Sequence, residues 1–499
     1  MHTYVYFLFA GAVVYVIRCA FKYGHRTSHM APGPPTLPFI GNIHQIPTSY
    51  THMKHVIPKT LFTEWAKRYG GIYSLKLGHQ TMVVVPDRKL VKQYVDKKST
   101  IYSHRPPSYV SHDLITRGNH LLVMHYGDQW RTFRKLINQH FMEAMCEREH
   151  LSVQNAEAVN LVKDFLVSPE DHMIHPKRFS NSVTNSIESL FSNWISRARA
   201  IGGSMESLYD DILKKVIERR ESGKSAGSFM DRVLDQQESE KIKLTNHQLS
   251  FLGGVLMEGG SDTSSALILA VVQALIKYLG NGRGKITSVV RFRQTTIHQQ
   301  DRQGGSPLEA HSSPLFPSRG WRRYASFQSN PLRRQLTALL DDWIDGHFVP
   351  KGSTVMLNVW GMHMDENVWE KPEDFIPERY DQHPSLAPVY VASGEWEKRD
   401  HYGYGAGRRV CPGIHLAERN MFLSVAKLLW AFRFEEEMGA DGKPLVNDPA
   451  PDTGYHQGFL YCAKDYGCKT TPRSDKIKET IMREYSEAEE SVFSRFIEV

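Results

Sequence analysis

The feature that most constrains this chain is a glycine-rich loop around a single cysteine. The stretch from His401 to Arg419 reads His-Tyr-Gly-Tyr-Gly-Ala-Gly-Arg-Arg-Val-Cys-Pro-Gly-Ile-His-Leu-Ala-Glu-Arg, with the cysteine at position 411. Glycines let the backbone adopt positive φ and pass close to a flat ligand. Proline suits the first turn of a helix, so we expect a helix to begin at Pro412 and to place Cys411 at its amino terminus.

A cysteine at a helix amino terminus is expected to be reactive. Backbone N–H groups and the positive end of the helix dipole both stabilise a thiolate. Arg409 adds positive charge two residues earlier and can bind an anionic group of the ligand. The alternative is a glycine-rich loop with an incidental cysteine.

A long helix is predicted over residues 246–278, with a polar stretch, Gly259–Ser264, in its middle. Glycine and hydroxyl side chains inside a helix favour a local kink or opening, because hydroxyls can bond back to carbonyls. An acid, Asp262, and an alcohol, Thr263, at such an opening could relay protons. Taken alone, the same stretch could be a loop.

A second helix, over residues 129–141, carries Trp130 and Arg134. Their i, i+4 spacing places both side chains on one helical face. Without further information this pattern also fits an amphipathic helix at the surface.

Together these motifs resemble the cytochrome P450 family. The family's haem-binding signature, Phe-x-x-Gly-x-Arg-x-Cys-x-Gly, falls on Tyr404, Gly407, Arg409, Cys411 and Gly413, with tyrosine in place of the usual phenylalanine. The resemblance implies haem b, with its iron bound axially by Cys411 as the metal ligand. In the family the thiolate pushes electron density onto the iron and favours cleavage of the O–O bond.

The same resemblance assigns roles to the other motifs. It implies that Trp130 and Arg134 bind a haem propionate, and that Asp262 and Thr263 are the catalytic acid and alcohol of oxygen activation. The stretch 375–380, Phe-Ile-Pro-Glu-Arg-Tyr, resembles the family's Pro-Glu-Arg element, with Arg379 as its structural arginine.

The expected fold is mainly α with small β-sheets, and the expected activity is haem-thiolate monooxygenation of a lipophilic small molecule. Residues such as Ser103–Ser108 and the long tail after the haem loop are similar to fungal microsomal monooxygenases of secondary metabolism, of the O-methylsterigmatocystin oxidoreductase type. The resemblance implies electrons from NADPH through a cytochrome reductase, which the basic side chains of Arg408 and Arg409 suit. Substrate-lining side chains are expected in residues 101–124, 251–262 and 454–461.

The sequence also departs from the family. The family's Glu-x-x-Arg motif occurs nowhere in the chain and should fall in residues 279–341, an anomalous segment rich in Arg, Gln, Ser, Pro and Gly. Codons for residues 294–311, shifted by one base, permit a family-like stretch that contains Glu-Ala-Leu-Arg. We therefore expect out-of-frame or retained-intron translation there, or a degraded gene. A second gap is expected near Ile187–Glu188, where relatives have the helices that cover the substrate pocket.

These departures leave two other functions open. An incomplete fold, without the distal lid helices and the Glu-x-x-Arg helix, could be an inactive remnant or a non-catalytic haem-binding membrane protein. A soluble thiol enzyme is a further alternative, but it needs a His–Cys pair that the sequence does not specify.

The amino-terminal 30 residues are expected to form a membrane anchor with a basic flank. Residues 4–17 carry no charge, and Arg18 and Lys22 follow. Positive charge after the apolar run favours an uncleaved anchor with a cytosolic body, in the endoplasmic reticulum membrane, over a cleaved signal peptide or a surface helix. Residues 31–42 hold four prolines and form a stiff Pro-rich hinge before the monooxygenase domain, 43–499.

Composition excludes several other classes. The 499 residues include five cysteines, an odd and sparse set that argues against a disulfide framework and for a reducing compartment. The net charge of +7 is scattered along the chain, so we expect no nucleic-acid partner.

Hydrophobic periodicity gives the remaining elements. A small hairpin is expected over residues 75–85, with Gly78 at its turn, and a second hairpin-like stretch over 342–354. Further helices are expected over 89–98, 155–165, 205–220 and from Cys411 to about Phe432.

Overall fold

A computed structural model of the chain describes residues 6, 10–16, 18, 23–46, 61–180, 194–224, 227–279, 335–372, 376, 383, 385–448, 453–456 and 462–494. The chain forms two compact units. The first comprises residues 1–106, 329–374 and 393–410, and the second comprises 107–328, 375–392 and 411–499. The cysteine loop is therefore shared, with the residues up to Val410 in the first unit and Cys411 in the second.

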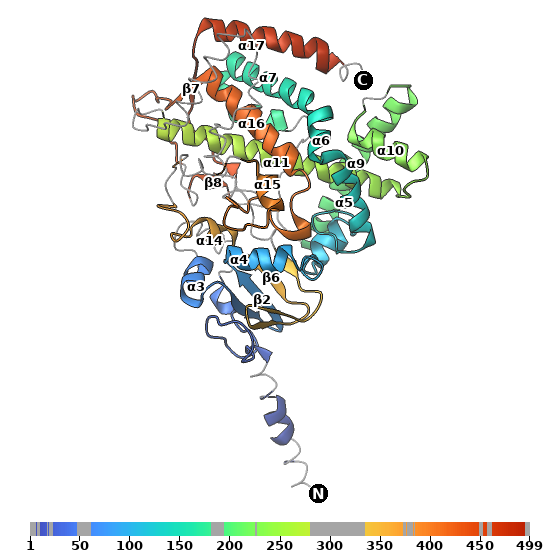
Figure 1. Cartoon of the computed structure of the whole chain (residues 1–499), viewed down its shortest axis with the longest axis vertical. Helices are drawn as coiled ribbons and strands as arrows, with labels where there is room; N and C mark the ends of the chain where they lie inside the picture. Colours follow the sequence, from blue (N-terminus) through green and yellow to red (C-terminus); the bar gives the residue numbers. More distant parts are fainter. Residues whose placement is uncertain are drawn as a thin grey trace. The chain divides into compact units, whose positions relative to one another are not determined.

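A four-stranded sheet organises the first unit (Figure 1). Strands β1 (Tyr73–Leu77) and β2 (Gln80–Val85) form the predicted hairpin, and Gly78 adopts the positive φ of 61° that its turn requires. Strand β6 (Thr354–Leu357) lies parallel to β2, and β3 (Gln335–Thr337) lies antiparallel to β6. The order is β1-β2-β6-β3, so the sheet joins segments that are far apart in sequence.

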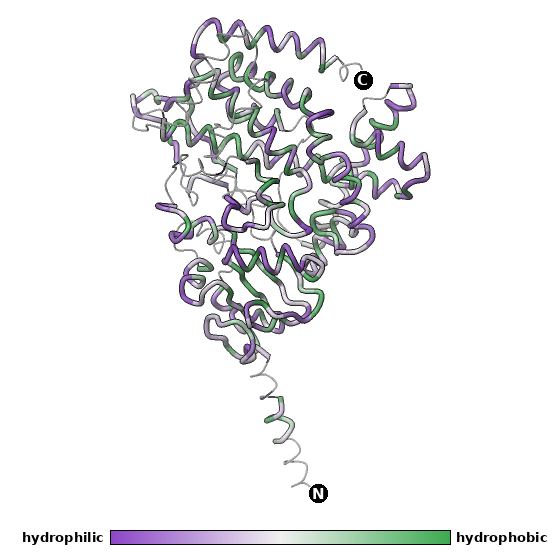
Figure 2. The backbone as a smooth tube through the Cα atoms, in the orientation of Figure 1, coloured by the Kyte–Doolittle hydropathy of each residue, from purple (hydrophilic) through white to green (hydrophobic). Residues whose placement is uncertain are grey.

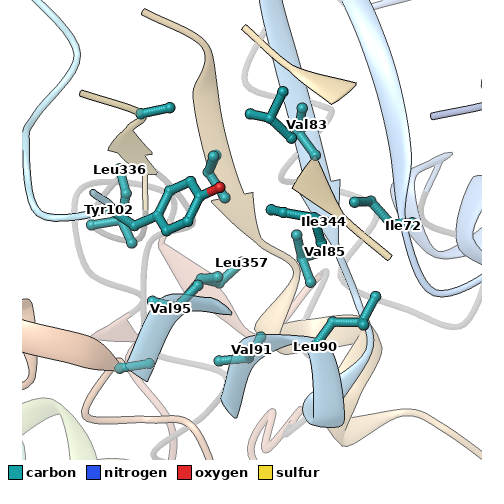
Figure 3. Close-up of a cluster of buried hydrophobic side chains, with 14 of the residues drawn as sticks. Ile72, Val83, Val85, Leu90, Val91, Val95, Tyr102, Leu336, Ile344 and Leu357 are labelled. Atoms are coloured by element: carbon teal, nitrogen blue, oxygen red, sulfur yellow. The ribbon is translucent and has the colours of Figure 1, made fainter. Parts of the chain in front are cut away.

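One face of this sheet packs on a buried apolar cluster. Figure 3 shows side chains of the strands, among them Val83, Val85 and Leu357, facing Val91 and Val95 from the helical segment that follows β2. That segment consists of α4 (Arg88–Leu90) and the π-helical turn η2 (Val91–Asp96), where a helix over 89–98 is predicted. Other elements of the unit are η1 (Ile43–Gln45), α3 (Leu61–Tyr69), the β4–β5 hairpin (Asp342–Ile344 and His347–Val349), α14 (Val359–His363) and η10 (Gly407–Arg409).

The Pro-rich segment packs on the first unit as an ordered part of it. Asn42 is fully buried, and its Nδ2 donates to the carbonyl oxygens of Pro34 (3.1 Å) and Pro35 (3.0 Å). Its Oδ1 accepts from the Lys76 N–H at 2.8 Å, which joins the segment to β1. The Arg26 guanidinium adds hydrogen bonds to the carbonyls of Gly33, Pro34 and Ser74.

The second unit is mainly helical, as predicted (Figure 1). Its longer helices before the cysteine are α5 (Asp128–Phe141), α7 (Leu151–Val167), α9 (Trp194–Glu221), α10 (Phe229–Glu238) and α11 (Asn246–Leu279). Shorter elements are η3 (Tyr109–Ile115), α6 (Glu143–Met145), η4 (Cys146–His150), η5 (Pro169–Asp171), α8 (His175–Ser180) and α15 (Ala387–Ala392).

After the cysteine come α16 (Ile414–Ala431), β7 (Phe432–Glu435), the short pair β8 (Tyr455–His456) and β9 (Cys462–Ala463), β10 (Lys469–Pro472), α17 (Asp475–Ala488) and η11 (Glu489–Phe493). Helix α16 packs against α7 and α11. Both α11 and α16 carry long hydrophobic stretches (Figure 2), which burial explains, since most side chains of their carboxyl-terminal halves are buried.

Among the described residues, one helix, Asn246–Lys277, is long and apolar enough to cross a membrane, and 78% of its most apolar stretch is buried inside the protein. That burial fits a core helix of a globular unit. Of the predicted anchor, residues 10–16 are described as an exposed helix, and most of its other residues lie outside the described part.

Several sequence predictions also fall outside the described residues. They are residues 280–334 of the anomalous segment 279–341, the expected gap near Ile187–Glu188 and the structural arginine Arg379. The expectation that the lid helices and the Glu-x-x-Arg helix are missing concerns these positions and stays a prediction.

Candidate haem-thiolate site

In the first unit, backbone groups of the cysteine loop contact neighbouring residues directly. Gly405 and Gly407 adopt positive φ values of 79° and 63°, and the Gly407 N–H donates to Asp96 Oδ1 at 2.7 Å. A Cβ on Gly407 would lie 2.7 Å from the carbonyl oxygen of Val95, too close for any other residue without a backbone shift. Gly407 is therefore required by sterics as well as by φ.

The predicted cation Arg409 is oriented by the same unit. Its Nε donates to the Ser103 carbonyl oxygen at 2.8 Å, and the neighbouring Arg408 Nε donates to Ser99 Oγ at 3.2 Å. Tyr404, the residue in the aromatic position of the loop, is half-buried and lies with its ring centroid 5.4 Å from that of His401.

Sequence reasoning missed one residue that shapes this loop, the fully buried Arg399. Its guanidinium lies over the Tyr402 ring at 3.9 Å and donates to the carbonyls of His401 and Gly405. Burial lowers the pKa of Arg399, while the negative charge of nearby Asp96 acts in the opposite direction. No local pattern marks this arginine, because its partners are backbone carbonyls that only the folded loop brings together.

Cys411 is a half-buried cysteine outside any disulfide, and it lies just before α16 in the second unit. The predicted helix start at Pro412 is wrong by two residues. Pro412 and Gly413 form a turn, Gly413 is the N-cap, and the first helical residue is Ile414. Cys411 nevertheless lies at the amino-terminal end of an 18-residue helix, where the helix dipole favours a negative sulfur.

Helix α5 brings a cation to this sulfur. Burial lowers the pKa of the Arg134 guanidinium to about 10, and the charge of Cys411 acts in the opposite direction, so the two groups interact electrostatically. Trp130, one turn earlier, is buried, with its ring centroid 5.2 Å from that of Tyr126. The structure thus gathers Trp130, Arg134, Cys411 and Gly413 in one unit, although they come from two distant segments.

The other described cysteines are poor candidates for a thiolate. Burial raises the pKa of Cys146 to about 11 and that of Cys468 to about 11. Burial also raises the pKa of Cys462, and the negative charge of Asp262 raises it further. Within the described part of the chain, these three thiols are therefore held in the neutral form.

The polar stretch of α11 carries the predicted acid and alcohol. Thr263 Oγ1 donates back to the Gly259 carbonyl oxygen at 2.8 Å, as predicted for a hydroxyl in a helix interior. The predicted opening does not interrupt the helix, which runs from Asn246 to Leu279 without a break. The back-bond adds to the helical hydrogen bonds here without replacing them.

The side chain of Asp262 is exposed in the middle of this long helix, while the residues after Thr263 are buried. Its charge acts on Cys462 of β9, a strand that packs against α11. Cys462 is a second residue near the site that sequence reasoning did not assign, since the predicted lining segment ended at residue 461.

These residues fit a haem group. In the second unit, Cys411 would bind the haem iron and Arg134 would supply a cation for a haem carboxylate. In the first unit, Arg409 offers another cation, and the glycines of the loop would allow close approach of a flat ring. The described residues contain no group of three or more His, Cys, Asp or Glu side chains that could hold a bare metal ion.

Comparisons with known proteins agree with this geometry. A family model described as cytochrome P450 matches residues 31–193 and 323–454. The chain is 52% identical to cytochrome P450 monooxygenase patH of Aspergillus clavatus, over 98% of each chain, and 51% identical to patH of Penicillium expansum, over 97% of each. It is 47% identical to cytochrome P450 monooxygenase acuC of Aspergillus aculeatus, over 99% of each.

Similar solved structures agree on the fold. A zebrafish cytochrome P450 with abiraterone superposes with a TM-score of 0.61 at 20% identity, over 84% of this chain and 100% of that one. The alignment with the Aspergillus clavatus relative runs over 540 positions, more than the 499 residues of this chain, so some of its positions hold no residue of this chain.

Proposed function

Since this chain belongs to the cytochrome P450 family and is a fungal monooxygenase of secondary metabolism, we propose that it binds haem b through Cys411 and oxidises a lipophilic small molecule. The observation that carries the proposal is the position of Cys411, which is outside any disulfide, lies three residues before α16 and is acted on by the Arg134 guanidinium. Both the helix dipole and the arginine favour the anion that an axial ligand must be.

Each predicted site residue has a distinct task in this proposal. Cys411 would bind the iron, and Arg134, Trp130 and Arg409 would bind and orient the propionates. Tyr404, Gly407 and Gly413 shape the loop that lies along the ring. When bound, haem supplies the iron at which dioxygen is activated and its O–O bond is cleaved.

The protein's own contribution to the reaction is a proton path on α11. The Asp262 carboxyl can exchange protons with solvent, because its side chain is exposed. Thr263 Oγ1 donates to Gly259 at 2.8 Å and keeps lone pairs with which it can accept a hydrogen bond from incoming water. The pair would supply protons for the activation of oxygen.

The partners follow from the family and the sequence. Electrons would come from NADPH through a cytochrome reductase, for which the exposed Arg408 offers positive charge. The amino-terminal segment would hold the protein in the endoplasmic reticulum membrane by a single anchor, with the catalytic body in the cytosol, since basic residues follow the uncharged run. Protease protection of the intact chain in microsomes tests this: a cytosolic body is digested and a lumenal one is protected.

The test of the main proposal is the difference spectrum of the reduced, CO-bound protein. A thiolate-type Soret band, with NADPH oxidation when the reductase is added, is the expected result. Haem uptake with a histidine-type band would contradict the ligand assignment.

One observation favours a second candidate, a non-catalytic haem-binding membrane protein or inactive remnant. The chain has no Glu-x-x-Arg sequence. A thiolate-type band without any NADPH oxidation above the rate of the reductase alone would support this candidate.

A further inference from the structure

Three polar side chains from three segments meet on α11 one helical turn before Asp262. Glu258 Oε2 lies 2.7 Å from His120 Nε2 and accepts a hydrogen bond from the Tyr209 hydroxyl at 3.1 Å. His120 belongs to the loop before α5, and Tyr209 belongs to α9. None of these side chains has a role in the site described above.

Hydrogen bonding sets the protonation pattern of the cluster. The Leu122 N–H donates to His120 Nδ1 at 3.3 Å, so Nδ1 is the acceptor and Nε2 carries the hydrogen that points to Glu258. Burial raises the pKa of Tyr209, and the charge of Glu258 raises it further, so its hydroxyl stays a neutral donor. The His120 Nε2–H and the Tyr209 hydroxyl therefore both donate to Glu258 Oε2.

Close packing of α9 on α11 fixes this arrangement. A Cβ on Gly254, one turn before Glu258, would lie 2.2 Å from the Tyr209 ring, so only glycine admits the ring there. The Tyr209 ring centroid also lies 5.1 Å from that of Phe251. The Tyr209 ring packs against Gly254, and this packing fixes the position of the hydroxyl that donates to Glu258.

Glu258 belongs to residues 251–262, one of the segments expected to line the substrate pocket, and its carboxylate is partly exposed. Glu258 keeps 34% of its side chain exposed, whereas only 7% of the His120 side chain is exposed. Gly259, Gly260 and Asp262 are exposed, although most side chains before residue 253 and after residue 263 on this helix are buried. Residues near His120 and Glu258 in the sequence belong to an apolar core cluster, in which Leu121 and Leu252 are buried and Val255 is partly buried.

We propose that Glu258 is the specificity-determining residue of the monooxygenase, and that its carboxylate accepts a hydrogen bond from a hydroxyl group of an otherwise apolar substrate. His120 and Tyr209 are positioning residues that act through Glu258. This inference rests on the proposed function and deepens it.

The Glu258 carboxylate, as the acceptor for the substrate hydroxyl, limits how the substrate can be oriented. Hydrogen bonds to a charged group are among the stronger ones, so the acceptor fixes the end of the substrate that carries the hydroxyl. The carbon presented for oxidation is then set by its distance from that hydroxyl. Glu258 and Asp262, at i and i+4, share a helical face, which places the anchored group and the proton source side by side.

The test compares two probes of similar size, cyclohexanol and methylcyclohexane, on the haem-loaded full chain. Bound fractions measured by headspace gas chromatography give the ratio of the two dissociation constants. We expect the wild type to prefer the alcohol, and Glu258→Gln to reduce this preference about tenfold, since the amide oxygen is a weaker acceptor than a carboxylate. Tyr209→Phe should reduce the preference less.

A matched control separates recognition from folding. Glu206 of α9 also pairs with a histidine of α11, His247, at 3.1 Å, and with Arg117 at 3.0 Å. Glu206→Gln therefore removes a carboxylate between the same two helices without changing Glu258, and it should leave the ratio unchanged. His120→Gln keeps an N–H donor and should retain the preference for cyclohexanol. His120→Leu removes the donor and should lose this preference.

An unchanged ratio in a folded, haem-loaded Glu258→Gln, or a wild type that does not prefer the alcohol, would overturn the inference. The CO spectrum of the same samples reports on Cys411 separately, so failure of the proposed function is distinguishable.

Discussion

The Lys427 ammonium and the Glu484 carboxylate form an ion pair at 3.2 Å that joins α16 to α17, and 2% and 9% of their side chains are exposed. Helix α16 begins three residues after Cys411, so the carboxyl-terminal helix is attached to the element that carries the proposed ligand. Burial lowers the pKa of Lys427, and Glu484 opposes this by favouring the charged form.

Breaking this pair from one side should destabilise the fold strongly. Lys427→Met leaves Glu484 buried beside an apolar side chain, which costs about 3–5 kcal/mol in the free energy of unfolding. The double variant Lys427→Met/Glu484→Met should recover most of that loss. Urea denaturation of the three proteins measures this, and a double variant no more stable than the single one would contradict the explanation.

Cys411→Ala should abolish the thiolate-type CO spectrum, because no other described cysteine is disposed to ionise. Cys462→Ala is the matched control, since this thiol is also half-buried but its pKa is raised. It should keep the spectrum. A persistent thiolate band in Cys411→Ala would remove Cys411 as the ligand.

Thr263→Ala should uncouple oxygen consumption from product formation, because it removes the hydroxyl next to Asp262. Loss of one proton-relay group typically costs about 10²-fold in the catalysed step. Product formed per oxygen consumed is the measurement. Ser265→Ala is the control, since Ser265 Oγ also bonds to a carbonyl of the helix, that of Asp262 at 3.1 Å. Equal coupling in both variants would exclude Thr263 from the relay.

Asn42→Ala should loosen the Pro-rich segment. The side chain is buried and bonds to Pro34, Pro35 and the Lys76 N–H, so its loss leaves buried partners unpaired at about 1–3 kcal/mol each. Limited proteolysis should then cut within residues 31–42 faster than in the wild type. Asn367→Ala, at an exposed turn, should not change the rate.

Asp231 should make the free energy of unfolding depend on pH in the acidic range. Burial alone raises the pKa of Asp231, but hydrogen bonds from Ser228 and the Arg219 guanidinium outweigh it and leave the pKa below its usual value. The stabilisation is complete above the unfolded value of 3.8 and is lost as the pH falls through the lower folded value.

Asp231→Asn should therefore be less stable at neutral pH and should lose less stability on acidification. Thermal unfolding between pH 7 and pH 3 tests this. Parallel curves for the two proteins would show that Asp231 does not contribute the pH dependence.

Local periodicity predicted the helices well where a helix is long and has one buried face. The predictions for 129–141 and 246–278 agree within one residue with α5 (Asp128–Phe141) and α11 (Asn246–Leu279). Helix α9 begins eleven residues before its predicted start at Met205, because Gly202 and Gly203 weaken the helical signal. Pairing of β2 with β6 was not predictable, since periodicity does not identify the partner of a strand.

The sequence by itself determined the chemistry of this protein: a thiolate-prone cysteine among glycines and arginines, and an acid and an alcohol inside an apolar helix. Those features are local, because they depend on residue type and spacing along a few turns of chain. Only the tertiary structure decided that Arg134 acts on Cys411 and that His120, Tyr209 and Glu258 meet. Such contacts arise from packing between distant segments, where burial makes each polar group depend on the particular partner that the fold brings to it.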